Sequence, residues 1–137
     1  MEALSTQQII ELLRNNMIFQ GSNVLGHFDD EHLKEAIRIV HISQVKPGDI
    51  IFKQGDQGDS IVLVLRGEVG VYVADERGDE THVATVEENT FFGEMAIIDE
   101  TNRLATVRAG SDCLLGTIPS TDFGSIFKSI RFWGKMY

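Results

Sequence analysis

The chain has 137 residues, of which 42% are hydrophobic and 24% charged, a composition typical of one folded domain with a real core. Its net charge of −9, without any cluster of Lys and Arg, disfavours direct binding to nucleic acid, whose phosphates the overall field repels. No apolar run approaches the ~18 residues of a membrane-spanning helix, the N-terminus does not resemble a signal peptide, and the lone Cys113 fits a buried, reduced thiol in a cytoplasmic protein.

Residues 1–41 are predicted to form an N-terminal helical segment. One helix is expected over residues 5–18, with Ser5 as its N-cap and Gln8 completing a capping box. A second helix is expected over residues 29–40. Each carries an apolar stripe at helical spacing: Ile9, Leu12, Leu13 and Met17 in the first, and Leu33, Ala36, Ile37 and Val40 in the second.

Residues 42–118 change to the period of β-strands. Short apolar runs are separated by turn signals, among them the bend at Arg77-Gly78, and the aspartates of these turns are expected to bond to the backbone. The predicted strands lie within 41–45, 49–54, 60–67, 68–75, 80–88, 104–110 and 113–118. A closed antiparallel sheet follows, either a sandwich or a jelly-roll barrel. We expect a C-terminal helix over 119–137 and no internal repeat.

The stretch 91–109, "FFGEMAIIDETNRLATVRA", interrupts this core pattern with polar residues. Gly93 allows a close approach to the backbone, and a helical turn from Met95 would direct free N–H groups at an anion. Arg103 could hold a phosphate through two hydrogen bonds, and Glu94 could accept hydrogen bonds from a sugar diol. The same two residues could instead form a structural ion pair at the end of the barrel.

These residues resemble the phosphate-binding cassette of the cyclic nucleotide-binding domain family. The run Phe92 to Ile98, "FGEMAII", is similar to the first part of the family pattern, and Arg103, Ala105 and Thr106 are similar to the second. Upstream, "VKPGDIIFKQGDQGDSIVLVLRGEVGVYV" has the glycines and aspartates of the family in the same order. The resemblance covers about residues 28–130.

The resemblance implies a mainly β domain with flanking helices, a double-stranded β-helix (jelly-roll barrel), that binds a 3′,5′-cyclic nucleotide. The cassette would span residues 91–108. By this resemblance Glu94 binds the ribose 2′-hydroxyl, Arg103 pairs with the cyclic phosphate, and Gly93, Ala96 and Ala105 offer backbone N–H groups. The implied ligand-binding set is Gly93, Glu94, Met95, Ala96, Arg103, Leu104, Ala105 and Thr106.

Two residues depart from the family pattern beside Arg103. Asn102 stands where the family usually has proline, and Leu104 stands where many members have Ala, Ser or Thr. A leucine offers no hydroxyl to the guanine amino group, so cAMP is favoured over cGMP as the ligand. Phe132, Trp133 and Tyr137 are candidates either to stack on the base or to dock on the barrel.

Two functions are compatible with this pattern. The first is a non-enzymatic cyclic-nucleotide sensor that regulates an effector protein or domain, and the second is a scaffold that keeps the fold without the ligand. A transcription regulator would need a helix-turn-helix and a basic surface, which this sequence does not supply. No nucleophile or paired-acid pattern indicates an enzyme. The histidines are scattered, so neither a metal nor a cofactor is expected: His27, His32, His41 and His82.

Overall fold

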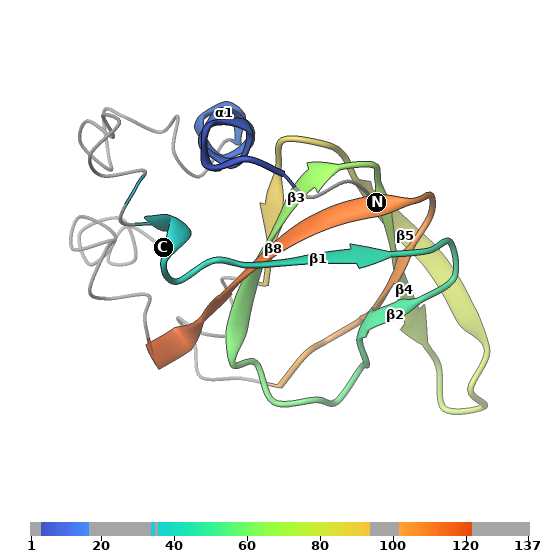
Figure 1. The fold of residues 1–137 in the computed structure, drawn as a ribbon. Coiled ribbons are helices and arrows are strands. Elements are labelled where there is room, and N and C mark those ends of the chain that lie inside the picture. Colours follow the sequence, from blue (N-terminus) through green and yellow to red (C-terminus); the bar gives the residue numbers. More distant parts are fainter. Residues whose placement is uncertain (1–3, 17–33, 35, 94–101, 122–137) are drawn as a thin grey trace.

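The computed structural model describes residues 4–16, 34, 36–93 and 102–121 (Figure 1). Within them, the strands form two four-stranded antiparallel sheets. The strands are β1 His41–Val45, β2 Ile50–Phe52, β3 Ser60–Arg66, β4 Val69–Ala74, β5 Glu80–Val86, β6 Phe91–Phe92, β7 Thr106–Ala109 and β8 Cys113–Pro119.

The order of the strands identifies the architecture. One sheet has the order β1-β8-β3-β6 and the other β2-β7-β4-β5, so the chain crosses repeatedly from one sheet to the other. This is the strand order of a jelly roll, which confirms the predicted mainly β fold and decides between the two architectures. β7 begins at Thr106, two residues later than predicted, because the backbone of Arg103 is bonded instead to the turn that contains Asp56.

Strand β3 is buried on both faces and separates two apolar clusters. Its alternate residues Val62 and Val64 point between the sheets, where they pack with residues of β4, β7 and β8. Ile61, Leu63 and Leu65 point the other way and pack against the helical residues outside the roll. The continuous apolar run of this strand therefore reflects burial on two sides.

Helix α1, Thr6–Asn15, covers the outer face of the sheet that contains β3 (Figure 1). The predicted capping box is confirmed, because the Ser5 hydroxyl accepts from the Gln8 N–H at 3.1 Å and the Gln8 side chain accepts from the Ser5 N–H at 2.8 Å. The predicted apolar stripe is confirmed where the structure describes it, because Leu13 is fully buried and Ile9 and Leu12 pack, partly buried, against the same core. The prediction omitted Ile10, which is also fully buried, and Met17 lies outside the described residues.

Among the other predicted elements, the end of the second helix and the β4–β5 hairpin agree with the structure, whereas the start of the C-terminal helix does not. Ala36 and Val40 are buried, and the Val40 N–H donates to the Ala36 carbonyl, as expected for the end of a helix. The β4–β5 hairpin bends at Gly78, whose φ is +85°. The C-terminal helix was expected to begin at Pro119, but Pro119 is the last residue of β8, residues 120–121 are helical, and 122–137 lie outside the described residues. In the described part of the chain, no helix is long and apolar enough to cross a membrane.

Candidate functional site

Arg103 is a buried cation at one end of the jelly roll. Only 6% of its surface is exposed. Its guanidinium donates to the carbonyl oxygen of Gly93 at 2.8 Å and to that of Ser60 at 2.6 Å. The guanidinium carbon also lies 3.6 Å from the centre of the Phe52 ring. Arg103 therefore joins the start of the cassette to β2 and β3.

Gly93 permits this arrangement for two reasons. Its φ of +96° lies in the left-handed region that other residues avoid. A Cβ atom at this position would also lie 2.7 Å from Nη1 of Arg103 and 3.1 Å from the Ser60 carbonyl oxygen. The expected positive φ of Gly93 is thus confirmed, and the group that closely approaches its backbone is the Arg103 guanidinium, whereas the approach of a ligand stays a prediction.

Phe52 and Ser60 were not among the residues predicted for this site. Phe52 stands in the ordinary β-type run of β2, and Ser60 contributes only its backbone oxygen. Both reach Arg103 through pairing between strands that are distant in sequence. The Phe52 ring meets the Phe92 ring edge to face, with the centroids 5.4 Å apart, so the aromatic start of the cassette also supports the contact.

The electrostatics of the site follow from the burial of Arg103. A guanidinium stays charged at any physiological pH, and removing it from water is costly unless its N–H groups have acceptors. The carbonyls of Gly93 and Ser60 are two such acceptors. Both acceptors are neutral carbonyls, and at this buried position the attraction between the guanidinium and an anion is screened far less than at the surface.

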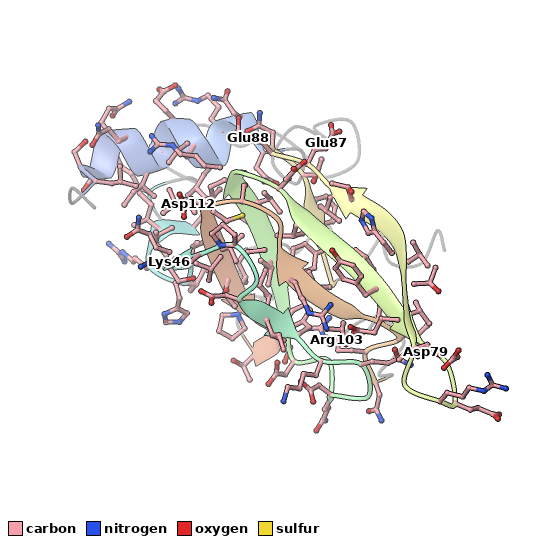
Figure 2. The ribbon with its side chains drawn as sticks, turned by 90° about the vertical axis from the view of Figure 1, so that its right-hand side faces the viewer. Lys46, Asp79, Glu87, Glu88, Arg103 and Asp112 are labelled. Carbon is pink, nitrogen blue, oxygen red and sulfur yellow. The ribbon has the colours of Figure 1, made fainter. Side chains whose placement is uncertain are left out.

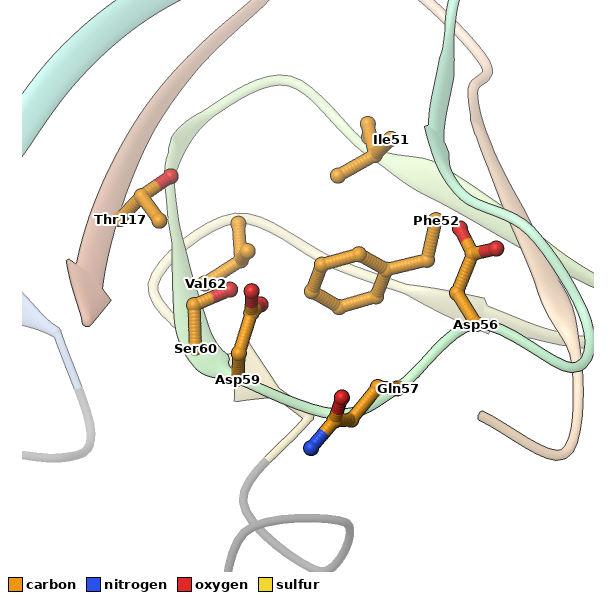
Figure 3. A pocket seen from close by; sticks show the side chains of 8 residues that line it. All are labelled: Ile51, Phe52, Asp56, Gln57, Asp59, Ser60, Val62 and Thr117. Carbon is orange, nitrogen blue, oxygen red and sulfur yellow. The ribbon is translucent and has the colours of Figure 1, made fainter. Parts of the chain in front are cut away.

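A cavity of about 500 Å³ lies beside the Arg103 contacts (Figure 3). Phe52 and Ser60 belong to its wall, and the Phe52 ring points across it. Asp56 and Asp59 line the same cavity from the loop between β2 and β3. Their carboxylates repel anions, so this cavity suits neutral or cationic groups better than a phosphate.

The other predicted ligand-binding residues fall into two groups. Glu94, Met95 and Ala96 lie outside the described residues, so their roles, and the alternative Glu94–Arg103 ion pair, stay predictions. The remaining members adjoin Arg103 in the chain. Leu104 is 81% exposed, Ala105 is half-buried, and Thr106 is buried, with its hydroxyl accepting from the Gln54 N–H at 3.0 Å.

A second arginine in the same segment has a different environment. Arg108 lies on β7 with its guanidinium 4.9 Å from the Tyr72 ring centre and an ion pair to Glu80. The Tyr72 ring stacks in turn on His82. Arg108 is partly exposed, and both of these partners lie on the β4–β5 hairpin. It thus serves as an internal comparison for Arg103.

Metal chemistry finds no support in the described residues. Among residues 4–16, 34, 36–93 and 102–121, no group of three or more His, Cys, Asp or Glu side chains could hold a metal ion. Cys113 is buried and free, as predicted, and its thiol donates to the Glu68 carbonyl at 3.1 Å.

Comparison with known sequences and structures places this geometry in a family. The family model of the cyclic nucleotide-binding domain matches residues 42–129. A cAMP-dependent protein kinase regulatory subunit of Dictyostelium discoideum is 35% identical over 126 residues, which are 91% of this chain and 37% of that protein. A cGMP-dependent protein kinase of Plasmodium berghei is 33% identical over 128 residues, which are 91% of this chain and 14% of that protein.

Solved structures agree on the fold. The regulatory subunit of a cAMP-independent protein kinase A from Trypanosoma brucei superposes with a TM-score of 0.81 at 21% identity, over 96% of this chain and 46% of that one. The catabolite activator protein of Thermus thermophilus gives a TM-score of 0.68 at 26% identity, over 79% and 51%. The chain thus spans about half or less of each of these proteins. Because the family model matches more than half of its residues, the chain belongs to the cyclic nucleotide-binding domain family.

Proposed function

We propose that this domain is a non-catalytic sensor that binds cAMP and passes the bound state to an effector protein or domain. The observation that carries the proposal is the buried Arg103, held against the carbonyl of Gly93 at the start of the cassette. A cyclic phosphate carries one negative charge and two free oxygens. It therefore suits a desolvated guanidinium that forms two parallel hydrogen bonds.

The proposed roles of the other residues follow the family resemblance. Glu94 binds the ribose 2′-hydroxyl, and the backbone N–H groups of Gly93, Ala96 and Ala105 surround the phosphate. Leu104 lacks a hydroxyl for the guanine amino group, which favours cAMP over cGMP. Its 81% exposure supports a place at the rim of the site, where it does not fill the space beside Arg103.

The effector is proposed to be a protein. The curated relatives named as regulatory subunits of cAMP-dependent protein kinase support a regulatory module that acts on a partner. A ligand can shift a conformational equilibrium only by its difference in affinity for the two states. The cassette and the helical segments that flank the roll are the proposed elements that change between these states.

Thermal unfolding with added nucleotide tests the proposal. At a cAMP concentration 100-fold above Kd, the bound domain should gain about 2.7 kcal/mol in unfolding free energy. Arg103→Ala should abolish this gain, whereas the matched Arg108→Ala variant should keep it. Leu104→Thr should raise the affinity for cGMP relative to cAMP. A folded wild-type protein without any shift at millimolar cAMP or cGMP would refute ligand binding.

A scaffold without ligand is the second candidate, and one observation favours it. Arg103 already joins Gly93 to Ser60 through hydrogen bonds, so this residue has a structural task even without a nucleotide. In that case Arg103→Ala would lower the melting temperature of the free protein, and no cyclic nucleotide would raise the melting temperature of the wild type. The same titration therefore separates the two candidates.

A further inference from the structure

A four-residue turn occurs twice in this chain, on the two sides of β2. The sequences are Lys-Pro-Gly-Asp at 46–49 and Lys-Gln-Gly-Asp at 53–56, seven residues apart. The expectation of no internal repeat concerned larger structural units, and a turn of four residues does not contradict it. Four matching residues within a glycine-rich segment carry little weight by themselves. The hydrogen bonds of the two turns show that they are similar in structure as well.

The two copies have the same internal geometry. The glycine φ is +90° in the first, at Gly48, and +93° in the second, at Gly55. In each turn the aspartate carboxylate accepts from the lysine backbone N–H, at 2.8 Å for Asp49 and 3.2 Å for Asp56. The aspartate N–H donates back to the lysine carbonyl at 3.0 Å in both. They are two examples of one turn.

Both turns bind the segment that contains Arg103 and β7, each at a different end. Gly48 donates to the Ala109 carbonyl at 2.8 Å, and the Ala109 N–H donates to the Asp49 carbonyl at 2.9 Å. In the second turn, Gly55 donates to the Arg103 carbonyl at 2.7 Å, and the Arg103 N–H donates to the Asp56 carbonyl at 2.6 Å.

The two turns therefore share their internal geometry and hold different residues of the same segment. Lys46, of the first turn, and Arg103 lie well apart in Figure 2. The chain thus contains its own control for the effect of the second turn on Arg103.

We propose that the turn 53–56 is a positioning device for the Arg103 guanidinium, and that Gly55 and Asp56 set the affinity for the cyclic phosphate without contacting it. This inference depends on the proposed function of Arg103. The turn fixes the Arg103 backbone, and Phe52, whose ring lies under the guanidinium, directly precedes Lys53. One short segment thus controls both ends of the arginine side chain.

A further set of contacts braces the second turn against the rest of the sheet. Gln54 stands where the first turn has Pro47. Its side-chain oxygen accepts from the Ala74 N–H at 2.8 Å, and its amide group donates to the Ala74 carbonyl at 3.3 Å. Its backbone N–H donates to the Thr106 hydroxyl at 3.0 Å. The turn is therefore tied to β4 and β7, which suits a part that holds a directional group.

The test compares matched variants in the two turns. Gly48→Ala and Gly55→Ala impose the same backbone strain, and a new Cβ meets nothing within 4 Å at either site. Asp49→Ala and Asp56→Ala remove the same side-chain hydrogen bond. For each variant, isothermal titration with cAMP gives Kd, thermal unfolding gives the stability of the free protein, and hydrogen exchange reports the amides of Arg103 and Ala109.

The two turns should have similar effects on the melting temperature but not on binding. Gly55→Ala and Asp56→Ala should weaken cAMP binding by about tenfold or more, because the two hydrogen bonds of a guanidinium to phosphate depend on its orientation. Gly48→Ala and Asp49→Ala should change Kd by less than about twofold. Equal losses of affinity from the two turns, or no loss from Gly55→Ala, would overturn the inference.

The sign of the Asp56 effect separates positioning from simple charge. Removing a negative charge beside Arg103 should strengthen anion binding if electrostatics alone act. Positioning predicts the opposite for Asp56→Ala. Asp56→Asn, whose side-chain oxygen can still accept from the Lys53 N–H, should bind cAMP at least as tightly as wild type. An Asp56→Ala variant that binds more tightly than wild type would contradict the positioning role.

Failure of the proposed function would be recognised separately. If the folded wild type does not bind cAMP, the proposed ligand binding is refuted. The positioning role of the turn can still be tested by amide hydrogen exchange in the free protein. Gly55→Ala should then accelerate exchange of the Arg103 amide at least about tenfold while leaving the Ala109 amide unchanged, because exchange protection reports the local opening of that hydrogen bond. Unchanged exchange at Arg103 would overturn the inference.

Discussion

The contact between Phe52 and Arg103 can be measured without any ligand. The guanidinium carbon lies 3.6 Å from the ring centre, and Arg103 is only 6% exposed. A cation over an aromatic face contributes ~0.5–1 kcal/mol at exposed sites and ~2 kcal/mol or more when desolvated. The buried end of this range, about 2 kcal/mol, applies here. Phe52→Leu removes the ring and keeps an apolar side chain.

The substitution also removes a second contact of the same ring. The Phe52 and Phe92 rings meet at 75° with their centroids 5.4 Å apart, a geometry that contributes ~0.5–1.5 kcal/mol. Together the two terms give a decrease of about 3 kcal/mol in the unfolding free energy of Phe52→Leu. Only the share from the cation, about 2 kcal/mol, should depend on Arg103.

A double-mutant cycle isolates that share. Urea unfolding of Phe52→Leu, Arg103→Met and the double variant should give a coupling energy of about 2 kcal/mol between the two residues. The matched cycle combines Phe52→Leu with Arg108→Met. Because Arg108 stacks on Tyr72 instead, this cycle should be additive within about 0.5 kcal/mol.

The result that refutes this reasoning is a small coupling in the first cycle. A value below about 0.5 kcal/mol would mean that the ring and the guanidinium do not stabilise each other. The orientation of Arg103 would then have to come from its hydrogen bonds alone. Equal couplings in the two cycles would mean that Phe52→Leu perturbs the roll generally.

Three further predictions concern stability, each measured by urea or thermal unfolding. Gly78→Ala should lower the unfolding free energy by about 1–2 kcal/mol, because Gly78 has a φ of +85° and a new Cβ would meet nothing. Gly67→Ala should lower it further, because its Cβ would lie 2.5 Å from the Asp112 carbonyl oxygen. Equal losses would contradict the packing argument. Ser5→Ala should lower stability by about 1 kcal/mol through loss of the capping box, and an unchanged midpoint would show that α1 does not need it. Asn102→Pro should raise the unfolding free energy by about 0.4–1 kcal/mol, because the backbone hydrogen bond to the Asp56 carbonyl is donated by the Arg103 N–H and not by that of Asn102. A lower unfolding free energy would mean that the Asn102 N–H forms a hydrogen bond that the protein needs.

The strands, turns and first helix could be predicted from local sequence because their causes are local. Alternating apolar residues define a strand, a serine with a glutamine three residues later caps a helix, and glycines with positive φ mark turns. The capping box at Ser5 and the bend at Gly78 are confirmed. The burial of Ile10 was not predicted, because an apolar stripe on a helix does not reveal the angle at which the helix meets its sheet.

The candidate site was only partly predictable. Gly93 and Arg103 stand out in the sequence because a glycine and a cation interrupt an apolar pattern, and the family resemblance gives them a role. Phe52 and Ser60 could not be predicted, since they reach Arg103 only through the pairing of distant strands. The burial of Arg103 is likewise a property of the assembled sheets.

The sequence by itself determined the elements, the family and the chemical character of the cassette. The order of the strands confirmed the jelly roll that the resemblance implied. Only the tertiary structure decided that the Arg103 guanidinium lies on the Phe52 ring. It also decided that the turn holding Gly55 and Asp56 binds the Arg103 backbone. The physical reason is that a turn's own geometry depends on four neighbouring residues, whereas the partner of its outward-facing N–H and carbonyl groups depends on the order in which strands pair.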